Sequence, residues 1–310
     1  MSNNIACVAT IGFFDGVHRG HQFLIRKVKQ LAAERGIQSV VITFPQHPRE
    51  VMQPGYHVDL LSTPAEKRAM LRAQGVDHVV ELPFTEELSR LSAKEFMVEV
   101  LQKRLHVEVL VIGYDHRFGH NRSEGFEDYQ RYGQEIGMEV VHAEACVVDG
   151  VTVSSSAIRG LLKGGEVTIA ARCLGYRYYL QGTVVKGFQN GHKLGFPTAN
   201  LKVDDPNKLV PADGVYAVWV QLGEQTYGGM LNIGFRPTLD NGKKRSIETY
   251  IMHFDEDIYG KPMQLTFVQR IRNEQKFQSL DELKRQLQHD AAQVEHMLFP
   301  PSPKIPPVEL

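Results

Sequence analysis

Apolar residues in the first half of the chain follow two alternating patterns. Short continuous apolar runs predict buried strands at residues 5–13, 39–44, 79–82, 107–112 and 138–142. Between them, apolar residues at intervals of three or four predict helices at residues 20–34, 85–105 and 124–136, and a hydroxyl, a proline and an acid mark a helix start at residues 62–66. Strands that alternate with helices predict a parallel sheet covered on both faces, which binds ligands beyond the carboxyl ends of its strands.

The pattern changes after residue 175. Segments rich in β-branched and aromatic residues, separated by Gly, Pro, Asn and Asp, predict strands at residues 178–185, 215–222, 227–233, 246–253 and 263–268. Short helices are expected before these strands at residues 155–163 and 166–174, and one long helix after them at residues 280–298. This pattern predicts a small antiparallel barrel closed by a C-terminal helix. The expected organisation is a first domain at residues 1–175, a second at 176–299 and a proline-rich tail at 300–310.

The composition is that of a globular protein. Of 310 residues, 42% are hydrophobic and 23% charged, and 35 Lys plus Arg stand against 36 Asp plus Glu, so no overall charge attracts nucleic acid or an anionic membrane. No basic residues precede the first apolar run, unlike in a signal peptide, and no run reaches the ~20 residues that span a bilayer. The three cysteines lack CxxC spacing, which indicates free thiols. We expect a cytoplasmic protein, monomeric or weakly homo-oligomeric, that binds small-molecule substrates but neither nucleic acid nor membrane.

The segment between the first strand and the first helix, residues 12–21, reads GFFDGVHRGH. Its glycines, beginning with Gly12, let the backbone approach a ligand closely. The helix start after Asp15 offers unpaired N–H groups and a partial positive charge, which suit phosphate. His18 and His21 can then donate hydrogen bonds to phosphate oxygens. Transfer at the α-phosphorus of ATP needs such fixed donors and no covalent intermediate.

Two other interpretations of these histidines are open at this stage. Both can be surface loop residues, because short motifs recur by accident. With His47 added they can also be zinc ligands, although no cysteine or acidic partner has suitable spacing. Three further polar clusters at the same predicted sheet edge favour phosphate. They are residues 43–48, residues 113–119 with Asp115, and residues 154–159 with Ser155, Ser156 and Arg159.

The last of these clusters combines hydroxyls at a helix start with an arginine one turn later, which makes a second phosphate cradle. Arg159 can neutralise the departing pyrophosphate there. The simpler alternatives are that the serines only cap the helix and that Asp115 is a turn residue.

A second set of oxygen ligands follows the first barrel strand, in the sequence LGFPTANL at residues 194–201. Thr198 and Asn200 are two residues apart, so they point to the same side of an extended segment. Their oxygens suit Mg²⁺, which keeps substrate phosphate among its ligands. Gly195 and the glycines before it form a flexible segment able to approach phosphates.

Glu248 is the candidate base for the hydroxyl that accepts the phosphate. It lies in the alternating sequence SIETYI at residues 246–251, on the face opposite to Ile247 and Thr249. An inward-facing carboxylate there can take the proton of an attacking alcohol. The alternatives are that residues 197–200 form a plain turn and that Glu248 faces water.

Taken in this order, GFFDGVHRGH, TFPQHP, GYDHRFG and SSSAIR closely resemble the adenylyltransferase module of bacterial bifunctional riboflavin kinase/FAD synthetases. The resemblance implies a Rossmann-like domain of the HxGH nucleotidyltransferase superfamily. It implies that His18, His21, Ser155 and Arg159 bind the phosphates of ATP. It also implies that Asp115 helps to place the nucleotide and the metal.

LGFPTANL and IETYIMHFDEDIYG resemble the riboflavin kinase module of the same family, so the resemblance covers about residues 5–298. It implies that Thr198 and Asn200 bind Mg–ATP and that Glu248 is the base for the ribityl 5′-hydroxyl. In the first module, Ser156 keeps the hydroxyl of a position that is often Thr in the family. The implied reactions are phosphorylation of riboflavin to FMN and adenylylation of FMN to FAD, with ATP as co-substrate and Mg²⁺ in both.

Two rival functions fit parts of the chain. The first domain alone can adenylylate another phosphorylated small molecule, because HxGH transferases act on several. The barrel can bind a flavin or an RNA as a sensor, although few basic and aromatic residues cluster as RNA binding requires. Phe118 is a candidate contact of the isoalloxazine ring, and core packing explains such a side chain equally well.

Overall fold

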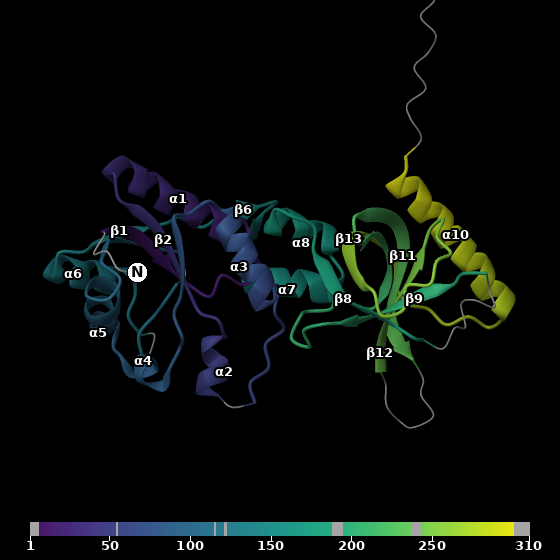
Figure 1. The fold of residues 1–310 in the computed structure, drawn as a ribbon, viewed down its shortest axis with the longest axis horizontal. Helices are drawn as coiled ribbons and strands as arrows, with labels where there is room; N and C mark the ends of the chain where they lie inside the picture. Colours follow the sequence, from purple (N-terminus) through teal and green to yellow (C-terminus); the bar gives the residue numbers. More distant parts are fainter. Residues whose placement is uncertain are drawn as a thin grey trace, which may run out of the picture. The chain divides into compact units, whose positions relative to one another are not determined.

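The computed structural model describes residues 6–53, 55–114, 116–120, 123–187, 195–236 and 244–300. Two compact units share the chain (Figure 1). The first consists of Met1–Arg159 with Cys173–Gly175, and the second of Gly160–Arg172 with Tyr176–Leu310. The domain boundary expected at residue 175 stays a prediction. The stretch Gly160–Arg172, which precedes this boundary, groups with the second unit.

The first unit is built on a five-stranded parallel sheet with the strand order β3-β2-β1-β4-β5. This arrangement confirms the predicted parallel sheet. Its strands are β1 (Cys7–Ile11), β2 (Gln38–Thr43), β3 (His78–Glu81), β4 (Val107–Ile112) and β5 (Glu139–His142). The order reverses beside β1, and ligands bind at such reversals, beyond the carboxyl ends of the strands.

Helices cover both faces of this sheet, because successive residues of β1 belong to different apolar clusters. Val8 packs with residues of α1 and α3, whereas Ala9 packs with residues of η2 and α6. Both faces are therefore buried, as in doubly wound sheets. The helices of this unit are η1 (Asp15–Val17), α1 (Arg19–Arg35), α2 (Pro48–Met52), α3 (Pro64–Ala73), α4 (Glu86–Arg90), α5 (Ala93–Glu95), the π-helix η2 (Phe96–Gln102) and α6 (Phe126–Ile136).

The helix expected over residues 85–105 is divided into α4, α5 and η2. The cause is local, because Thr85 and Ser92 both act as N-caps. The Thr85 side chain accepts a hydrogen bond from the Leu88 N–H, and that of Ser92 accepts one from the Glu95 N–H. A second capping residue inside the segment ends the first helix and starts another.

The second unit is a closed antiparallel barrel with the strand order β10-β11-β12-β9-β8-β13. A long helix, α10 (Leu280–Leu298), packs on it through Val294 and Leu298, which meet Val215 and Met230 in one apolar cluster (Figure 1). The barrel and its helix confirm the predicted fold. The strands are β8 (Tyr179–Val185), β9 (Thr198–Val203), β10 (Gly214–Leu222), β11 (Gln225–Arg236), β12 (Lys244–Ile251) and β13 (Pro262–Arg272).

Two helices and a small hairpin complete the described elements. They are α7 (Ser155–Gly164), α8 (Val167–Leu174), and the hairpin of β6 (Val147–Val148) and β7 (Val151–Thr152). None of the three cysteines forms a disulfide. In the part of the chain that the structure describes, none of the helices has the length and apolar character to span a membrane.

We expect Gly182→Ala to destabilise the barrel. Gly182 lies in β8, where an added Cβ would come within 2.1 Å of the Lys202 carbonyl oxygen in β9. Backbone of a paired strand cannot move away without breaking the pairing, so the loss should be about 1–3 kcal/mol of unfolding free energy. Chemical denaturation of the purified chain measures it.

Gly160→Ala is the matched control, because nothing lies within 4 Å of a Cβ at this position of α7. It should be neutral or add up to about 1 kcal/mol, since Ala is the better helix former. Equal stability of the two variants would contradict the close β8–β9 approach.

Candidate active sites

The two histidines of the first site are brought together by the turn between β1 and α1. Phe14, Gly16 and Val17 have positive φ values of 56°, 74° and 35°, which turns the chain sharply before the helix. His18 then caps α1, because its Nδ1 accepts a hydrogen bond from the His21 N–H over 3.3 Å. The two imidazole rings stack with their centroids 3.6 Å apart. Both side chains are thus held at the N-terminus of α1, as the sequence predicted.

Both histidines are neutral at physiological pH. Burial lowers the pKa of His18, which is 4% exposed, to about 4. Burial, followed by the nearby charge of His18, holds the pKa of His21 well below its usual range. Since His18 accepts through Nδ1, its proton resides on Nε2, which is free to donate. The Nδ1 atom of His21 is buried and has no hydrogen-bond partner among the described residues.

The carboxylate of Asp15 organises the surrounding loops. It is 2% exposed and accepts hydrogen bonds from the N–H groups of Leu61 and Ser62, each over 3.0 Å. Its Oδ2 also forms an ion pair of 2.6 Å with Arg159. Asp15 precedes the helix start that the sequence predicts to bind phosphate, and its carboxylate oxygens are engaged in joining three segments of the chain.

The start of α7 is bonded to the same turn. Ser155 Oγ donates to the Asp15 carbonyl oxygen over 3.1 Å, and Arg159 Nε donates to the Asp59 carbonyl oxygen over 2.7 Å. The positive charge of Arg159 also contributes to the lowered pKa of His18. Ser155 and Arg159 are therefore gathered with the histidines, as predicted.

The remaining predicted residues of this site lie on different segments of the first unit or outside the described residues. Gly12 follows β1 and donates its N–H to the Ile42 carbonyl oxygen over 3.0 Å. Ser156 is exposed in the first turn of α7, and Asp115 lies outside the described residues. His47 caps α2 by accepting from the Arg49 N–H over 3.2 Å.

A cleft of about 430 Å³ opens at the carboxyl edge of this sheet. Its aromatic lining comes from segments that follow four of the strands, namely Phe13, Phe44, Phe84, Phe96 and Phe118. Its cationic or titratable lining residues are His47, Arg49, His116, Arg117 and His120. Among the described residues no carboxylate lines the cleft, so this lining suits a flat, anionic ligand. Only Phe118 was singled out from the sequence, because no local pattern predicts which phenylalanines share a cleft.

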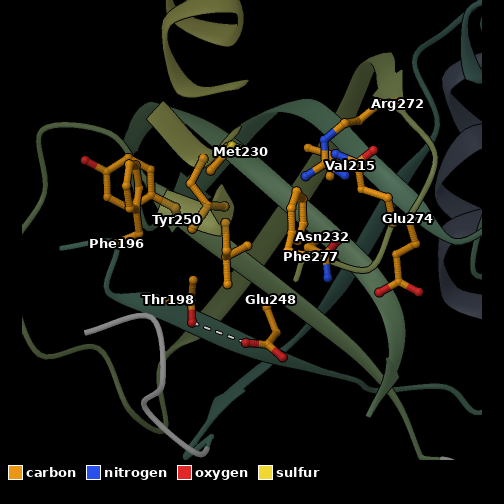
Figure 2. Close-up of a pocket in the computed structure, with 13 residues that line it drawn as sticks. Phe196, Thr198, Val215, Met230, Asn232, Glu248, Tyr250, Arg272, Glu274 and Phe277 are labelled. Atoms are coloured by element: carbon orange, nitrogen blue, oxygen red, sulfur yellow. Dashed lines mark hydrogen bonds between the residues drawn. The ribbon is translucent and has the colours of Figure 1, made fainter. Parts of the chain in front are cut away.

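The second site lies between β12 and β9. Glu248 pairs with Asn200 across the two strands. Thr198 Oγ1 donates to Glu248 Oε2 over 3.4 Å, and Figure 2 shows the two side chains pointing toward one another. Ser246 Oγ donates to Glu248 Oε1 over 3.0 Å. Thr198 and Glu248 line one cavity, so the predicted base and the predicted phosphate ligand share a site.

Asn200 lies opposite Glu248 in the paired strands, and Gly195 precedes Thr198 in the chain. Asn200 is 7% exposed, and Gly187 approaches it so closely that a Cβ there would come within 2.1 Å of Asn200 Nδ2. Gly195 has a φ of +82°, which favours glycine. These positions fit a backbone that approaches a ligand closely, and residues 188–194, which include Gly191 and Lys193, lie outside the described part.

The cavity beside Glu248 has a volume of about 360 Å³ and largely apolar walls. Phe196 and Tyr250 meet edge to face with centroids 5.0 Å apart at one side (Figure 2). Arg272, which forms an ion pair of 2.8 Å with Asp290, and Phe277 line the other side. No sequence pattern marks Arg272 or Phe277 as cavity residues, because their positions depend on how β13 and the segment after it meet the barrel.

The oxygen donors of the second site suit a hard cation. The Thr198 hydroxyl, the Asn200 amide and the Glu248 carboxylate are the ligand types that Mg²⁺ prefers when phosphate completes its shell. The described residues contain no group of three or more His, Cys, Asp and Glu placed to hold a metal ion.

Fold and geometry together define a two-domain transferase with one phosphate-suited site on the sheet and another in the barrel. Family models agree, because that of the FAD synthetases matches residues 1–157 and that of the riboflavin kinases matches residues 174–298. The chain belongs to the bifunctional riboflavin kinase/FMN adenylyltransferase family.

Relatives match over nearly the whole chain. The bifunctional riboflavin kinase/FMN adenylyltransferase of Pseudomonas fluorescens is 37% identical over 95% of this chain and 94% of its own. That of Escherichia coli K12 is 37% identical over 92% and 90%. A crystal structure from Streptococcus pneumoniae, described as a macrolide-efflux protein, has a TM-score of 0.85 and 33% identity over 95% of both chains.

Acid should destabilise the first unit through its buried histidines. Burial lowers the pKa of His18 and of His47 to about 4 and holds that of His21 well below its usual range. Below about pH 6.5 these histidines bind protons in the unfolded chain but stay neutral in the folded chain. The free energy of unfolding therefore decreases as the pH falls from about 6.5 to about 4. For His18 alone this amounts to about 3 kcal/mol.

Thermal unfolding followed from pH 7 to pH 4 measures this loss. His18→Gln should make the decline shallower, because it removes one imidazole that must stay neutral. His289→Gln, at an exposed position of α10, should leave the decline unchanged. An identical decline in the His18→Gln variant would contradict the proposed cause.

Proposed function

We propose that the chain converts riboflavin to FAD in two ATP-dependent steps at separate sites. The barrel phosphorylates riboflavin to FMN and releases ADP. The parallel-sheet domain then joins FMN to the AMP part of a second ATP and releases pyrophosphate. The observation that carries this assignment is that each domain holds its own donor set, His18 with His21 and Thr198 with Glu248, and that each matches the family model for one activity.

The kinase step needs a base, and Glu248 fills this role. Thr198 and Ser246 hydroxyls each bond one of its oxygens, which fixes the carboxylate in the cavity. Glu248 takes the proton of the ribityl 5′-hydroxyl, and the oxygen attacks the γ-phosphorus of ATP as the bond to ADP breaks. Thr198 and Asn200 would hold Mg²⁺, which supplies charge neutralisation at the transferred phosphoryl group. The aromatic pair Phe196 and Tyr250 offers a flat wall for the ring system.

The adenylyl-transfer step needs donors rather than a base. A phosphomonoester such as FMN is already anionic at pH 7, so its oxygen attacks the α-phosphorus of ATP directly while the bond to pyrophosphate breaks. His18 and His21, at the positive end of α1, donate to the oxygens on which charge accumulates. Ser155 and Arg159, at the start of α7, bind the leaving pyrophosphate.

The cleft at the sheet edge accounts for the flavin substrate of this step. Its aromatic walls, including Phe118, match an isoalloxazine ring, and Arg49 and Arg117 match a phosphate. We therefore assign the cleft to FMN, with Gly12 and Asp15 forming the adjoining turn. Asp115 and Ser156 complete the nucleotide site in this proposal.

The remaining features of the proposal follow from this chemistry. Small molecules are the substrates, and neither nucleic acid nor membrane takes part. The first activity resides in residues 1–175 and the second in 176–299, and the expected tail lies outside the described residues after residue 300. We assign the chain to the cytoplasm as a monomer or weak homo-oligomer, because ATP and free flavins occur together there and a reducing compartment suits cysteines that form no disulfide.

Single substitutions should separate the two activities. His21→Ala should lower FAD formation from FMN by about 10²–10³-fold, because it removes one donor to the transition state. Glu248→Gln should lower FMN formation from riboflavin by about 10²–10⁴-fold, because it removes the base while keeping the shape. Each variant serves as the control of the other when FMN and FAD are separated by chromatography.

The expected result is that each variant keeps the untouched activity near the wild-type rate. A folded variant that lost both activities would refute the assignment of the two steps to independent sites. Failure of the wild-type chain to make FMN from riboflavin, ATP and Mg²⁺ would refute the kinase assignment itself.

A further inference from the structure

Lys67 is a buried lysine beneath the sheet edge that carries the first site. It lies in α3, and only 2% of it is exposed. Its Nζ donates to the Phe44 carbonyl oxygen over 2.7 Å and lies 3.8 Å from the centroid of the Phe13 ring. Burying an ammonium group is costly unless its charge is compensated.

The compensation within the protein is incomplete. In the described part of the chain, Lys67 has one hydrogen-bond acceptor and one aromatic face, and it forms no ion pair. Asp15 and Glu81 act on it only at longer range. One carbonyl oxygen and one aromatic ring offset only part of the desolvation cost of the buried Lys67 ammonium group. The uncompensated charge indicates that Lys67 acts on the ligand of the first site.

The contacts of Lys67 join two loops of the site. Phe13 follows β1 and leads into the turn before His18, whereas Phe44 follows β2 and leads to His47. The Phe13 ring meets the His47 ring with centroids 4.7 Å apart. Displacing the ammonium would therefore release both loops at once, although Lys67 itself does not line the cleft.

The charge of Lys67 also acts on two site histidines, because it contributes to the low pKa values of His21 and His47. Burial in turn lowers the pKa of Lys67 from 10.5 to about 8, a value at which it titrates within an accessible range. The titratable or charged groups that face it come from its own helix, from the segments after β1 and β2, and from the end of β3. They are Arg68, Asp15, His21, His47 and Glu81.

We propose that Lys67 is a positioning residue for adenylyl transfer. Its ammonium group fixes the positions of the Phe13 and Phe44 segments relative to each other. It also maintains a positive electrostatic potential near the bound phosphates. This inference rests on the proposed adenylyltransferase activity of the first domain.

Lys67→Met in the full chain tests the proposal, because methionine keeps much of the length and removes the charge. FAD formation from FMN should fall by roughly tenfold to a hundredfold in kcat/KM, less than for loss of a direct donor. Riboflavin kinase activity of the same preparation should stay at the wild-type rate, which controls for folding and concentration. Lys67→Arg, which keeps the charge, should retain more of the activity.

The pH profile separates a charge effect from a purely structural one. In the wild type, kcat/KM for FAD formation should fall as the pH rises through about 8, because the free enzyme loses the Lys67 charge there. Lys67→Arg should shift this decline to higher pH, and Lys67→Met should abolish it. These comparisons also decide the matter if Lys67→Met fails to fold, since the wild type and Lys67→Arg alone show the shift.

An unchanged alkaline decline in the Lys67→Arg variant, or wild-type kcat/KM in Lys67→Met, would overturn the role of Lys67. By contrast, a wild-type chain that makes no FAD from FMN and ATP would refute the proposed function rather than this inference.

Discussion

The buried carboxylate of Asp15 is the interaction on which the first site depends. It binds the backbone of Leu61 and Ser62 and the guanidinium of Arg159, so three distant segments meet at one charge. Such a carboxylate is stable in the interior because every partner is a directed donor. The side chains that we propose as phosphate donors are consequently held in place by contacts within the protein. Preorganisation of this kind lowers the barrier of a reaction in which the protein stabilises charge and forms no covalent bond.

In the barrel, strand pairing holds the polar side chains of the second site in place. Register between β9 and β12 places Asn200 opposite Glu248, and side-chain hydroxyls orient the carboxylate. Backbone pairing supplies the precision that the buried ion pair supplies in the first unit. Both sites thus use rigid elements to hold polar groups.

Much of the fold could be predicted from the sequence, because local physics decides it. The helix at residues 280–298 has the expected bounds, and Thr63 with Glu66 forms a capping box at the predicted start of α3. The sheet-edge clusters were found because parallel strands share a carboxyl edge. Burial of Lys67 could not be predicted, since a lysine between a glutamate and an arginine in a helix is typical of a solvent-facing position. Only the packing of α3 under the ends of β1 and β2 buries it.

Two separate sites direct nucleophiles at two different phosphorus atoms of ATP in the proposed function: the ribityl hydroxyl at the γ-phosphorus and the FMN phosphate at the α-phosphorus. The most direct measurement supplies the chain with riboflavin and with ATP labelled either at the α-phosphorus or at the γ-phosphorus, and follows the label into FMN and FAD. The account predicts that the γ-label enters FMN and passes into FAD, whereas the α-label enters FAD alone. An α-label in FMN, or FAD that lacks the α-label, would contradict it.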